Sequence, residues 1–415
     1  MVIRLTRDYF VVRRHLQQAH GFVEAAAWYT LRRFGSSFDK KTPSMLDEVC
    51  RPLLPTAERL LPYLRSIDES RWYSNWGDLA KTFERRLSAK LGLAQHECTV
   101  ANNATSGITA ALVAVADRAS PARPFCLMPS YTYVATAAAA LGAGYVPYFV
   151  DVDPNTFAMN PETIAAHPML SKAGAIIAVA PYGRSIASAA WQKFSKEFGL
   201  PVVIDAAAGF DALLSGEATI ARNVPIVLSF HATKAFGIGE GGAIVCRGSE
   251  LARRCHRALN LGFLGSREAR MAGINGKLSE YHAAVGLAEL DGWRAKRRSF
   301  IRVARAYHRA AKAHGLDDRI LTQRTWASSY ALFFAESAAA ARKAAARLRS
   351  AGLGFRWWYG NGVHREPAYR RMPADPLPVT EDIARRLIGL PVWVELDDAT
   401  IDCVVAALAG NGRTA

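Results

Sequence analysis

The chain has 415 residues, half of them hydrophobic, and a formal net charge of +16. A chain of this size can bury a large core and is long enough for two domains, while none of its apolar runs reaches the roughly 18 residues that a membrane span needs. The positive charge would suit nucleic acid, anionic lipid or an acidic small substrate, but no zinc-finger spacing or RNA-binding aromatic motif supports nucleic acid as a partner.

The first 44 residues form a basic extension whose composition differs from the rest of the chain. Up to Ser37 they hold six arginines against one aspartate and one glutamate. The pattern from Ala19 to Arg33 fits a basic amphipathic helix, and the segment lacks the apolar region and cleavage site of a signal peptide. We expect the functional chain to need only the residues from Met45 onward.

The next part of the chain predicts helices and one anion-binding turn. Residues 52–93 have a helical pattern that an aromatic stretch, Trp72 to Gly77, interrupts. Asn102 to Gly107 is a polar turn that opens an apolar helix over 108–116. Such a turn can bind an anion, because free N–H groups and the helix dipole point outward, but an ordinary helix cap has the same pattern.

Short apolar strands then alternate with helical segments as far as residue 259. This alternation predicts a mainly parallel sheet with helices on its faces. The remainder, from about Ala295, alternates helices with short strands and is predicted to form a smaller domain. The strands expected in the first part are 125–128, 145–151, 173–180, 200–205, 226–228 and 243–246.

A lysine stands where an apolar strand gives way to a glycine-rich turn. Lys234 follows the strand over 226–228 and precedes four glycines and a second strand. A lysine in an apolar pocket can have a lowered pKa and form a Schiff base with a carbonyl group. A surface lysine on a hairpin turn would give the same local pattern.

A carboxylate ends another predicted strand, at Asp205. Ligands of open α/β sheets bind beyond the carboxyl ends of the strands, so Asp205 is expected to face a site, although a cap or strand-end hydrogen bond is the alternative. Pyridoxal phosphate needs a lysine for its aldehyde and a carboxylate opposite its ring nitrogen. Lys234 and Asp205 could supply this pair.

Three motifs occur in an order that resembles sugar aminotransferases of the DegT/DnrJ/StrS type. They read IDAAAG, SFHATKAFGIGEGG and GINGKLSEYHAA, and the similarity extends from about Trp72 to about Leu408. The resemblance implies pyridoxal phosphate as cofactor and the aspartate aminotransferase fold (fold type I). That fold has a three-layer large domain around a mainly parallel sheet and a smaller C-terminal α/β domain. The domains implied are a basic extension (1–44), a large cofactor-binding domain (45–294) and a small domain (295–415).

The resemblance also implies the residues of the site. Lys234 would carry the cofactor and act as acid and base, and Asp205 would hold the protonated ring nitrogen. Thr105, Ser106 and Ser229 would bind the phosphate. The matching cofactor-binding positions are Thr105, Ser106, Tyr133, Asp205, Ala207, Ser229, Lys234 and Asn275.

Two aspects of this implied site concern the cofactor ring and a second subunit. Tyr133 and Ala207 would sandwich the pyridine ring, and Asn275 would reach the phosphate bound by a neighbouring subunit, which implies a homodimer with shared active sites. Several positions differ from the family pattern, among them Asp78 in place of a proline and Ala180 and Pro181 in a turn before a tyrosine. Ala208 replaces a histidine or glutamine near the ring hydroxyl, and Lys277 replaces an arginine.

The sequence therefore predicts an aminotransferase that moves an amino group from glutamate to a nucleotide-linked keto deoxysugar, at C3 or C4. A sugar dehydratase that uses the same cofactor is one alternative, although Lys234 argues against it, and a non-catalytic protein of the same fold is another. The six cysteines show no metal-ligand spacing, so we expect no metal site, free thiols and a cytoplasmic location. They are Cys50, Cys98, Cys126, Cys246, Cys255 and Cys403.

Overall fold

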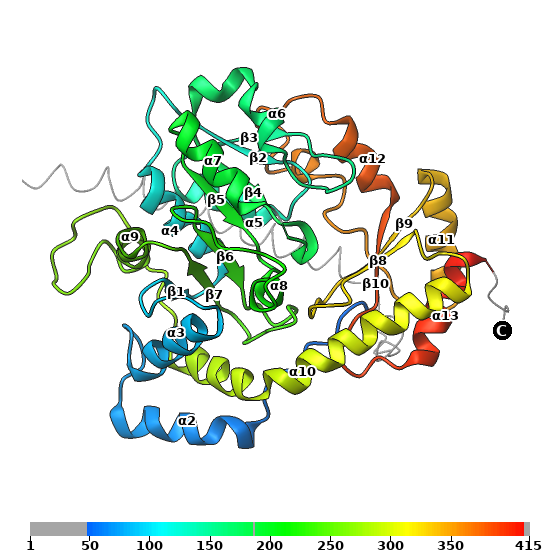
Figure 1. Ribbon diagram of the computed structural model, residues 1–415, viewed down its shortest axis with the longest axis horizontal. Helices are drawn as coiled ribbons and strands as arrows, with labels where there is room; N and C mark the ends of the chain where they lie inside the picture. The colour runs from blue at the N-terminus through cyan, green and yellow to red at the C-terminus, as the bar shows by residue number, and fades with distance from the viewer. Residues whose placement is uncertain (1–47, 186, 411–415) are drawn as a thin grey trace, which may run out of the picture. The chain divides into compact units, whose positions relative to one another are not determined.

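The computed structural model describes residues 48–185 and 187–410. Within these residues, a seven-stranded sheet and a three-stranded sheet are linked by the long helix α10 (Glu280–Ala313), which runs from one to the other in Figure 1. The expectations for residues 1–44 and for Met45, including the helix over 19–33, lie outside the described residues. Among the residues described, no helix is long and apolar enough to cross a membrane.

The larger sheet is mainly parallel, as the sequence predicts. Only β7 runs antiparallel to its neighbours, β1 and β6, and nearly all strand residues are buried because helices cover both faces. In spatial order the strands are β1 (Cys98–Ala101), β7 (Gly242–Val245), β6 (Ile226–Ser229), β5 (Val202–Asp205), β4 (Ala173–Val179), β2 (Phe125–Pro129) and β3 (Val146–Val150).

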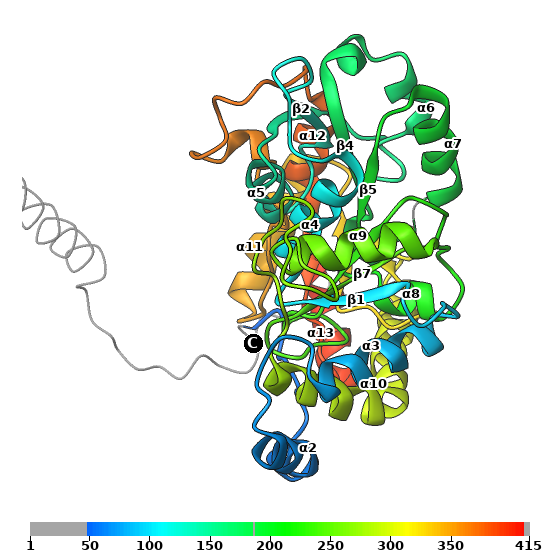
Figure 2. The ribbon, with the colours of Figure 1, turned by 90° about the vertical axis from the view of Figure 1, so that its left-hand side faces the viewer.

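Helices on the two faces make this part of the molecule a three-layer structure. On one face α4 (Ala104–Ala116) packs against α5 (Val134–Gly142) and α9 (Ser249–Leu259). On the opposite face lie α6 (Pro161–Ala165) and α7 (Ser188–Phe198), as Figure 2 shows. Helix α4 is apolar on nearly all sides, since it is enclosed between the sheet and its two helical neighbours.

The smaller sheet is antiparallel and is covered by helices, and it lies in the part of the chain that is predicted to form a second domain. Its strands, in spatial order, are β10 (Leu387–Leu390), β9 (Ala331–Phe334) and β8 (Ile320–Thr322). Helices α11 (Ala338–Ser350), α12 (Pro378–Arg386) and α13 (Asp398–Ala409) pack beside it with α10. The boundary expected after residue 294 falls inside α10, and the division into domains stays a prediction.

The first described helices are α2 (Ala57–Ser70) and α3 (Asp78–Lys90), so the predicted break at Trp72 to Gly77 is confirmed. The buried Glu280 carboxylate accepts hydrogen bonds from the first turn of α3, from Leu79 N–H at 2.8 Å and Ala80 N–H at 3.1 Å. A Cβ atom on Gly77 would lie 2.6 Å from this carboxylate, so only glycine fits there. The remaining short elements are α8 (Phe210–Leu214) and 3-10 turns at Pro168–Lys172, Pro181–Gly183 and Val363–Arg365.

Candidate active site

Lys234 lies in the turn between β6 and β7, and the turn has a fixed shape. Ala232 N–H donates to the Gly239 carbonyl at 2.8 Å. A Cβ atom on Gly237 would lie 2.7 Å from the Ala232 carbonyl oxygen, so this close approach requires glycine. The Lys234 side chain is half-buried, and it therefore differs from a freely solvated lysine on a hairpin.

The amine of Lys234 is bound by a tyrosine that the sequence did not indicate. Nζ donates a hydrogen bond to Tyr330 Oη at 2.9 Å. Burial lowers the pKa of Lys234, but the Tyr330 oxygen, Asp205 and Tyr133 together outweigh it, so the pKa lies above its ordinary value. The sequence left open a lowered pKa for Lys234 in an apolar pocket. Oxygen atoms surround the amine in the structure, and they favour its charged form.

Asp205 ends β5 and is only 6% exposed. One carboxylate oxygen accepts from Thr136 Oγ1 at 2.8 Å, and the other accepts from Ala207 N–H at 3.1 Å. Burial raises the pKa of this carboxyl, while the two hydrogen bonds and the nearby Lys234 act in the opposite direction. The bond to Ala207 is the strand-end hydrogen bond of the alternative interpretation, and the bond to Thr136 ties the carboxylate to the first turn of α5.

The residues expected to bind the phosphate come together at the start of α4. Thr105 and Ser106 lie in its first turn, where the Asn103 side chain accepts from Ser106 N–H at 2.8 Å. Gly242 pairs with Ser229 across β6 and β7, and a Cβ atom on Gly242 would lie 2.9 Å from the Ala104 nitrogen. The glycine therefore lets the helix start approach Ser229. The cap that the sequence left open as an alternative is present beside these residues.

The ring-stacking position is held by an exposed aromatic residue. Tyr133 immediately precedes α5 and is 65% exposed. Because Thr136 in the same turn bonds to Asp205, Tyr133 lies near that carboxylate. Ala207 follows Asp205 by two residues and is half-buried. The structure therefore places both residues beside Asp205, and their stacking on a ring stays a prediction.

Asn275 lies in an exposed loop that contacts the start of α4. It forms an isolated bridge with Asn260, and the next residue, Gly276, accepts a hydrogen bond from Asn102 N–H at 2.8 Å. A Cβ atom on Gly276 would lie 3.5 Å from the Ser106 side chain. Asn275 therefore adjoins a residue that is bonded to the polar turn before α4 of its own chain. Its proposed contact with the phosphate of a neighbouring subunit stays a prediction.

Tyrosine rings from distant segments pack around Tyr330, the hydrogen-bond partner of Lys234. The rings of Tyr182 and Tyr359 are stacked with their centroids 4.9 Å apart, and Tyr182 Oη donates to Tyr131 Oη at 2.7 Å. Tyr182 and Tyr359 have left-handed backbones, with φ of 56° and 59°. Seven other described residues that are not glycine also have positive φ, so this backbone conformation does not by itself mark a functional site.

The loop that carries Tyr359 is fastened to the end of β2. Ser130 Oγ and His364 Nδ1 lie 2.6 Å apart, and Val363 N–H donates to the Ser130 carbonyl at 2.9 Å. Burial lowers the pKa of His364, which favours the neutral ring that can accept from or donate to the hydroxyl. These contacts hold the left-handed tyrosine against the larger sheet.

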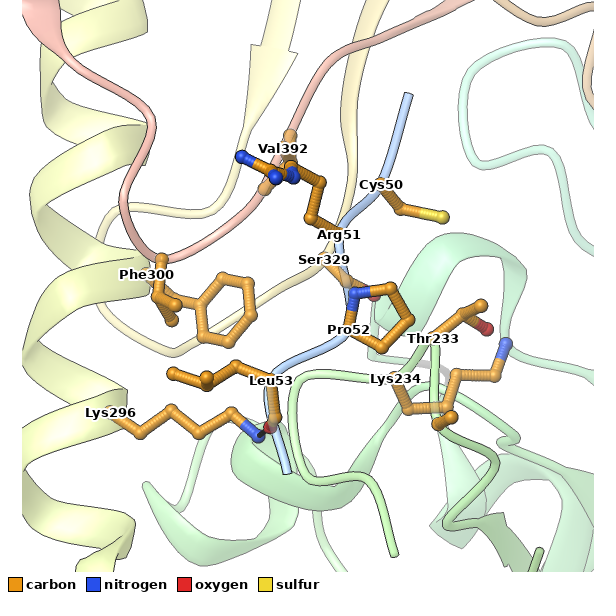
Figure 3. A pocket seen from close by; sticks show the side chains of 12 residues that line it. Cys50, Arg51, Pro52, Leu53, Thr233, Lys234, Lys296, Phe300, Ser329 and Val392 are labelled. Carbon is orange, nitrogen blue, oxygen red and sulfur yellow. Dashed lines mark hydrogen bonds between the residues drawn. The ribbon is translucent and has the colours of Figure 1, made fainter. Parts of the chain in front are cut away.

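A small pocket lies beside Lys234 and is closed by the first described segment (Figure 3). Cys50 to Leu53 form one wall, opposite Thr233 and Lys234. Two hydrogen bonds fix this wall: Val392 N–H donates to the Val49 carbonyl at 2.9 Å, and Lys296 Nζ donates to the Leu53 carbonyl at 2.6 Å. The segment just after residue 47 therefore belongs to the surroundings of the lysine.

Solved structures define the class of this fold. A structure described as DesI in the presence of its TDP-sugar product is 28% identical, with a TM-score of 0.72, and the match covers 92% of this chain and 97% of that one. The arrangement is the fold type I of aminotransferases that use pyridoxal phosphate, as the sequence predicts. Within residues 48–185 and 187–410, no cluster of histidine, cysteine and acidic side chains could hold a metal ion.

The chain belongs to the DegT/DnrJ/EryC1/StrS aminotransferase family, whose sequence profile matches residues 56–409. Protein Rv3402c of Mycobacterium tuberculosis is 34% identical over 373 residues, covering 86% of this chain and 88% of the relative. The dTDP-4-amino-4,6-dideoxy-D-glucose transaminase of Shigella dysenteriae is 32% identical over 243 residues, covering 59% of this chain and 64% of the relative. The resemblance stated from the three motifs is confirmed.

The site fits pyridoxal phosphate, the cofactor of the family. The cofactor presents a phosphate, a ring nitrogen and an aldehyde, and the structure offers a helix start, a buried carboxylate and an amine. Among the described residues, no arginine or lysine is bonded to Asp205, so its charge is available to a protonated ring nitrogen. Gly242 lies against the Ala104 nitrogen at the start of α4. Because glycine has no side chain, none projects there into the turn that is proposed to bind the phosphate.

The structure also shows the surroundings of Ala208 and Lys277, two of the positions that differ from the family pattern. Ala208 packs against Gly183, where a Cβ atom would lie 2.5 Å from the Ala208 carbonyl oxygen. The Ala208 methyl group cannot donate the hydrogen bond that a histidine or glutamine would donate at this position. Tyr182 immediately precedes Gly183, the glycine against which Ala208 packs. Lys277 is half-buried, and burial lowers the pKa of its amine. An ammonium group there is a weaker substitute for a bidentate arginine.

Proposed function

We propose that this protein transfers an amino group from glutamate to a nucleotide-linked keto deoxysugar. The observation that carries the proposal is that Asp205 ends β5 while Lys234 lies in the turn after the neighbouring strand β6, within a family of aminotransferases. Support for the sugar comes from the names of two relatives, a transaminase of a dTDP-linked aminosugar and DesI with its TDP-sugar product.

Each residue of the site has one role in this proposal. Lys234 would hold the cofactor through its aldehyde, and its free Nζ would hold and move the proton. Asp205 holds the protonated ring nitrogen. Thr105, Ser106 and Ser229 bind the phosphate. When bound, the cofactor supplies an electron-withdrawing ring that accepts the electron pair left on the donor carbon.

Two further proposals complete the picture of the site. Tyr133 and Ala207 enclose the cofactor ring from opposite sides, and Asn275 reaches the phosphate in a second copy of the chain, so that the active unit is a homodimer.

The six cysteines are free thiols, which supports a reducing compartment such as the cytoplasm.

Two measurements test the proposal. Reduction of the purified protein with borohydride should fix the cofactor on Lys234, and peptide mapping identifies the residue that carries it. Label on another lysine would show that the site is assigned wrongly. A panel of nucleotide keto sugars should be incubated with glutamate. The mass of the product should show that the keto oxygen has been replaced by an amino group and a hydrogen atom.

The same panel separates the alternative functions. A product that has lost water without gaining nitrogen would identify a dehydratase. A protein that binds no cofactor and converts no sugar would be the non-catalytic member of the fold. Lys234 argues against the first alternative, and the intact Lys234–Asp205 pair argues against the second.

A further inference from the structure

Tyr330 is the one hydrogen-bond partner of Lys234 Nζ among the described residues, and it comes from the other sheet. The two side chains are joined by the 2.9 Å bond from Nζ to Oη. Tyr330 lies immediately before β9, the central strand of the smaller sheet, whereas Lys234 follows β6 of the larger sheet. The residue is not part of the three motifs by which the family is identified.

Ring packing fixes the position of this hydroxyl. The Tyr330 ring meets the Tyr182 ring edge-on at a centroid distance of 5.5 Å and the Trp358 ring at 5.2 Å. Its backbone N–H donates to Ser328 Oγ at 3.2 Å. A ring held between two aromatic neighbours and tied at its backbone has little freedom, so its Oη is a fixed point for the flexible lysine.

The chemistry of a phenol suits an amine that gains and loses a proton. A hydroxyl both donates and accepts, so Oη can accept from an ammonium group and donate to a neutral amine. The carboxylate of Asp205 can only accept when ionised. A group that matches both forms of the amine keeps Nζ in one place throughout a cycle in which its charge changes.

We propose that Tyr330 is a positioning residue for Lys234, holding the free amine toward the site in both its charged and its neutral form. The inference rests on the proposed function for its purpose, but the contact itself does not depend on a cofactor. It gives the smaller sheet a direct part in the placement of the amine.

The test uses Tyr330→Phe in the full chain, which keeps the ring and removes the oxygen. In protein freed of cofactor, the pH dependence of Lys234 acylation by an amine-selective reagent, followed by peptide mass spectrometry, reports the protonation of this amine. Oη can bond to both forms of the amine, but its bond from the ammonium form is charge-assisted and is the stronger of the two. Loss of the oxygen should therefore shift the acylation profile to lower pH. With cofactor and substrates, kcat should fall roughly 10- to 100-fold with little change in the KM for the amino donor.

Tyr307→Phe is the matched control, because it removes the hydroxyl of another buried tyrosine, whose Oη donates to the Pro391 carbonyl at 2.8 Å. It should lower stability without moving the Lys234 profile. An unshifted profile in Tyr330→Phe would overturn the positioning role whatever the enzyme does. Absence of cofactor on Lys234 in the wild type would instead overturn the proposed function. The acylation profiles of the cofactor-free proteins would still decide whether Tyr330 positions the amine.

Discussion

The two sides of Lys234 are built from different chemistry. The polar side consists of residues at strand ends, Asp205 and Ser229, and residues at the start of α4, Thr105 and Ser106. The register of the larger sheet places the strand ends. On the aromatic side, rings from loops and from the edge of the smaller sheet pack against one another. The aromatic side consists of Tyr131, Tyr182, Tyr330, Trp358 and Tyr359.

This difference determines how each side responds to change. A polar group held by sheet register can be removed while its neighbours stay in place, so its loss should affect chemistry more than structure. The aromatic rings hold one another, so a change at one ring should be transmitted to the hydroxyl that meets Lys234. The following predictions test that contrast, from the largest expected effect to the smallest.

The largest effect is expected on the polar side. Asp205→Ala removes the charge proposed to hold the ring nitrogen and should lower kcat by roughly a thousandfold, as measured by steady-state conversion of the sugar substrate. Ala208→Gln, three residues away, should change kcat far less. A similar loss in both variants would mean that the segment, and not the carboxylate, is what activity requires.

Mixing two inactive variants tests whether the polar side is completed by a second chain. Lys234→Ala removes the amine, and Asn275→Asp places a carboxylate beside the partner's phosphate. In a two-fold dimer, random pairing makes about half of the dimers mixed, each with one intact site, so roughly a quarter of wild-type activity should return. Wild-type protein taken through the same unfolding and refolding is the control, and no gain over the separate variants contradicts the shared site.

Glu84 shows the effect of burial on a carboxyl group to which no ammonium group among the described residues is bonded, since burial outweighs three hydrogen bonds and the nearby charge of Lys81. Burial raises its pKa from 4.5 to about 7, and one oxygen accepts from Trp76 Nε1, Thr99 Oγ1 and Val100 N–H. Glutamine offers the same acceptor, so Glu84→Gln should keep these bonds.

The sign of the effect follows from the folded protein holding this proton more strongly than the unfolded chain. Wild-type stability relative to Glu84→Gln should fall as the pH rises from about 4.5 to about 7, by roughly 3 kcal/mol. Urea unfolding of both proteins across this range measures it. His256, whose pKa burial lowers to about 4, is common to both proteins and cancels in the difference; a pH-independent difference would contradict the buried charge.

On the aromatic side, Gly389→Ala should disturb the ring packing from outside the site. Its Cβ atom would lie too close to the Trp358 indole nitrogen for both to stay in place, and Trp358 supports Tyr330. We expect a loss of about 2 kcal/mol in unfolding free energy together with reduced activity. Gly315→Ala, with φ of 68° and no atom within 4 Å, should cost about 1 kcal/mol and leave activity unchanged.

The smallest effect is expected for removal of the basic extension. A chain that starts at Met45 keeps the wall from Cys50 to Leu53 and should retain its melting temperature and activity. A chain that starts at Pro55 loses the bonds from Val392 and Lys296 to that wall and should melt a few degrees lower, by roughly 2–5 °C. Equal behaviour of the two chains would show that the wall contributes nothing.

The polar side could be predicted from sequence because its residues stand next to strands and helix starts. Lys234 and Asp205 follow apolar runs, and the turn before α4 has a recognisable polar composition. Tyr330 had no such signal, since a serine pair and a tyrosine before a short strand are common. Its contact depends on how the smaller sheet packs beside the larger one, and the left-handed backbones of Tyr182 and Tyr359 likewise depend on contacts between distant segments.

The antiparallel strand β7 also has a consequence for the order in which the protein is made. The strand begins at Gly242 and pairs with β1, which ends at Ala101, so the anion-binding turn at the start of α4 cannot be enclosed until this later part of the chain has left the ribosome. Tyr330 follows later still. The hydrogen bond between Lys234 and Tyr330 therefore forms only after most of the chain has been synthesised, and contacts so distant in sequence form slowly.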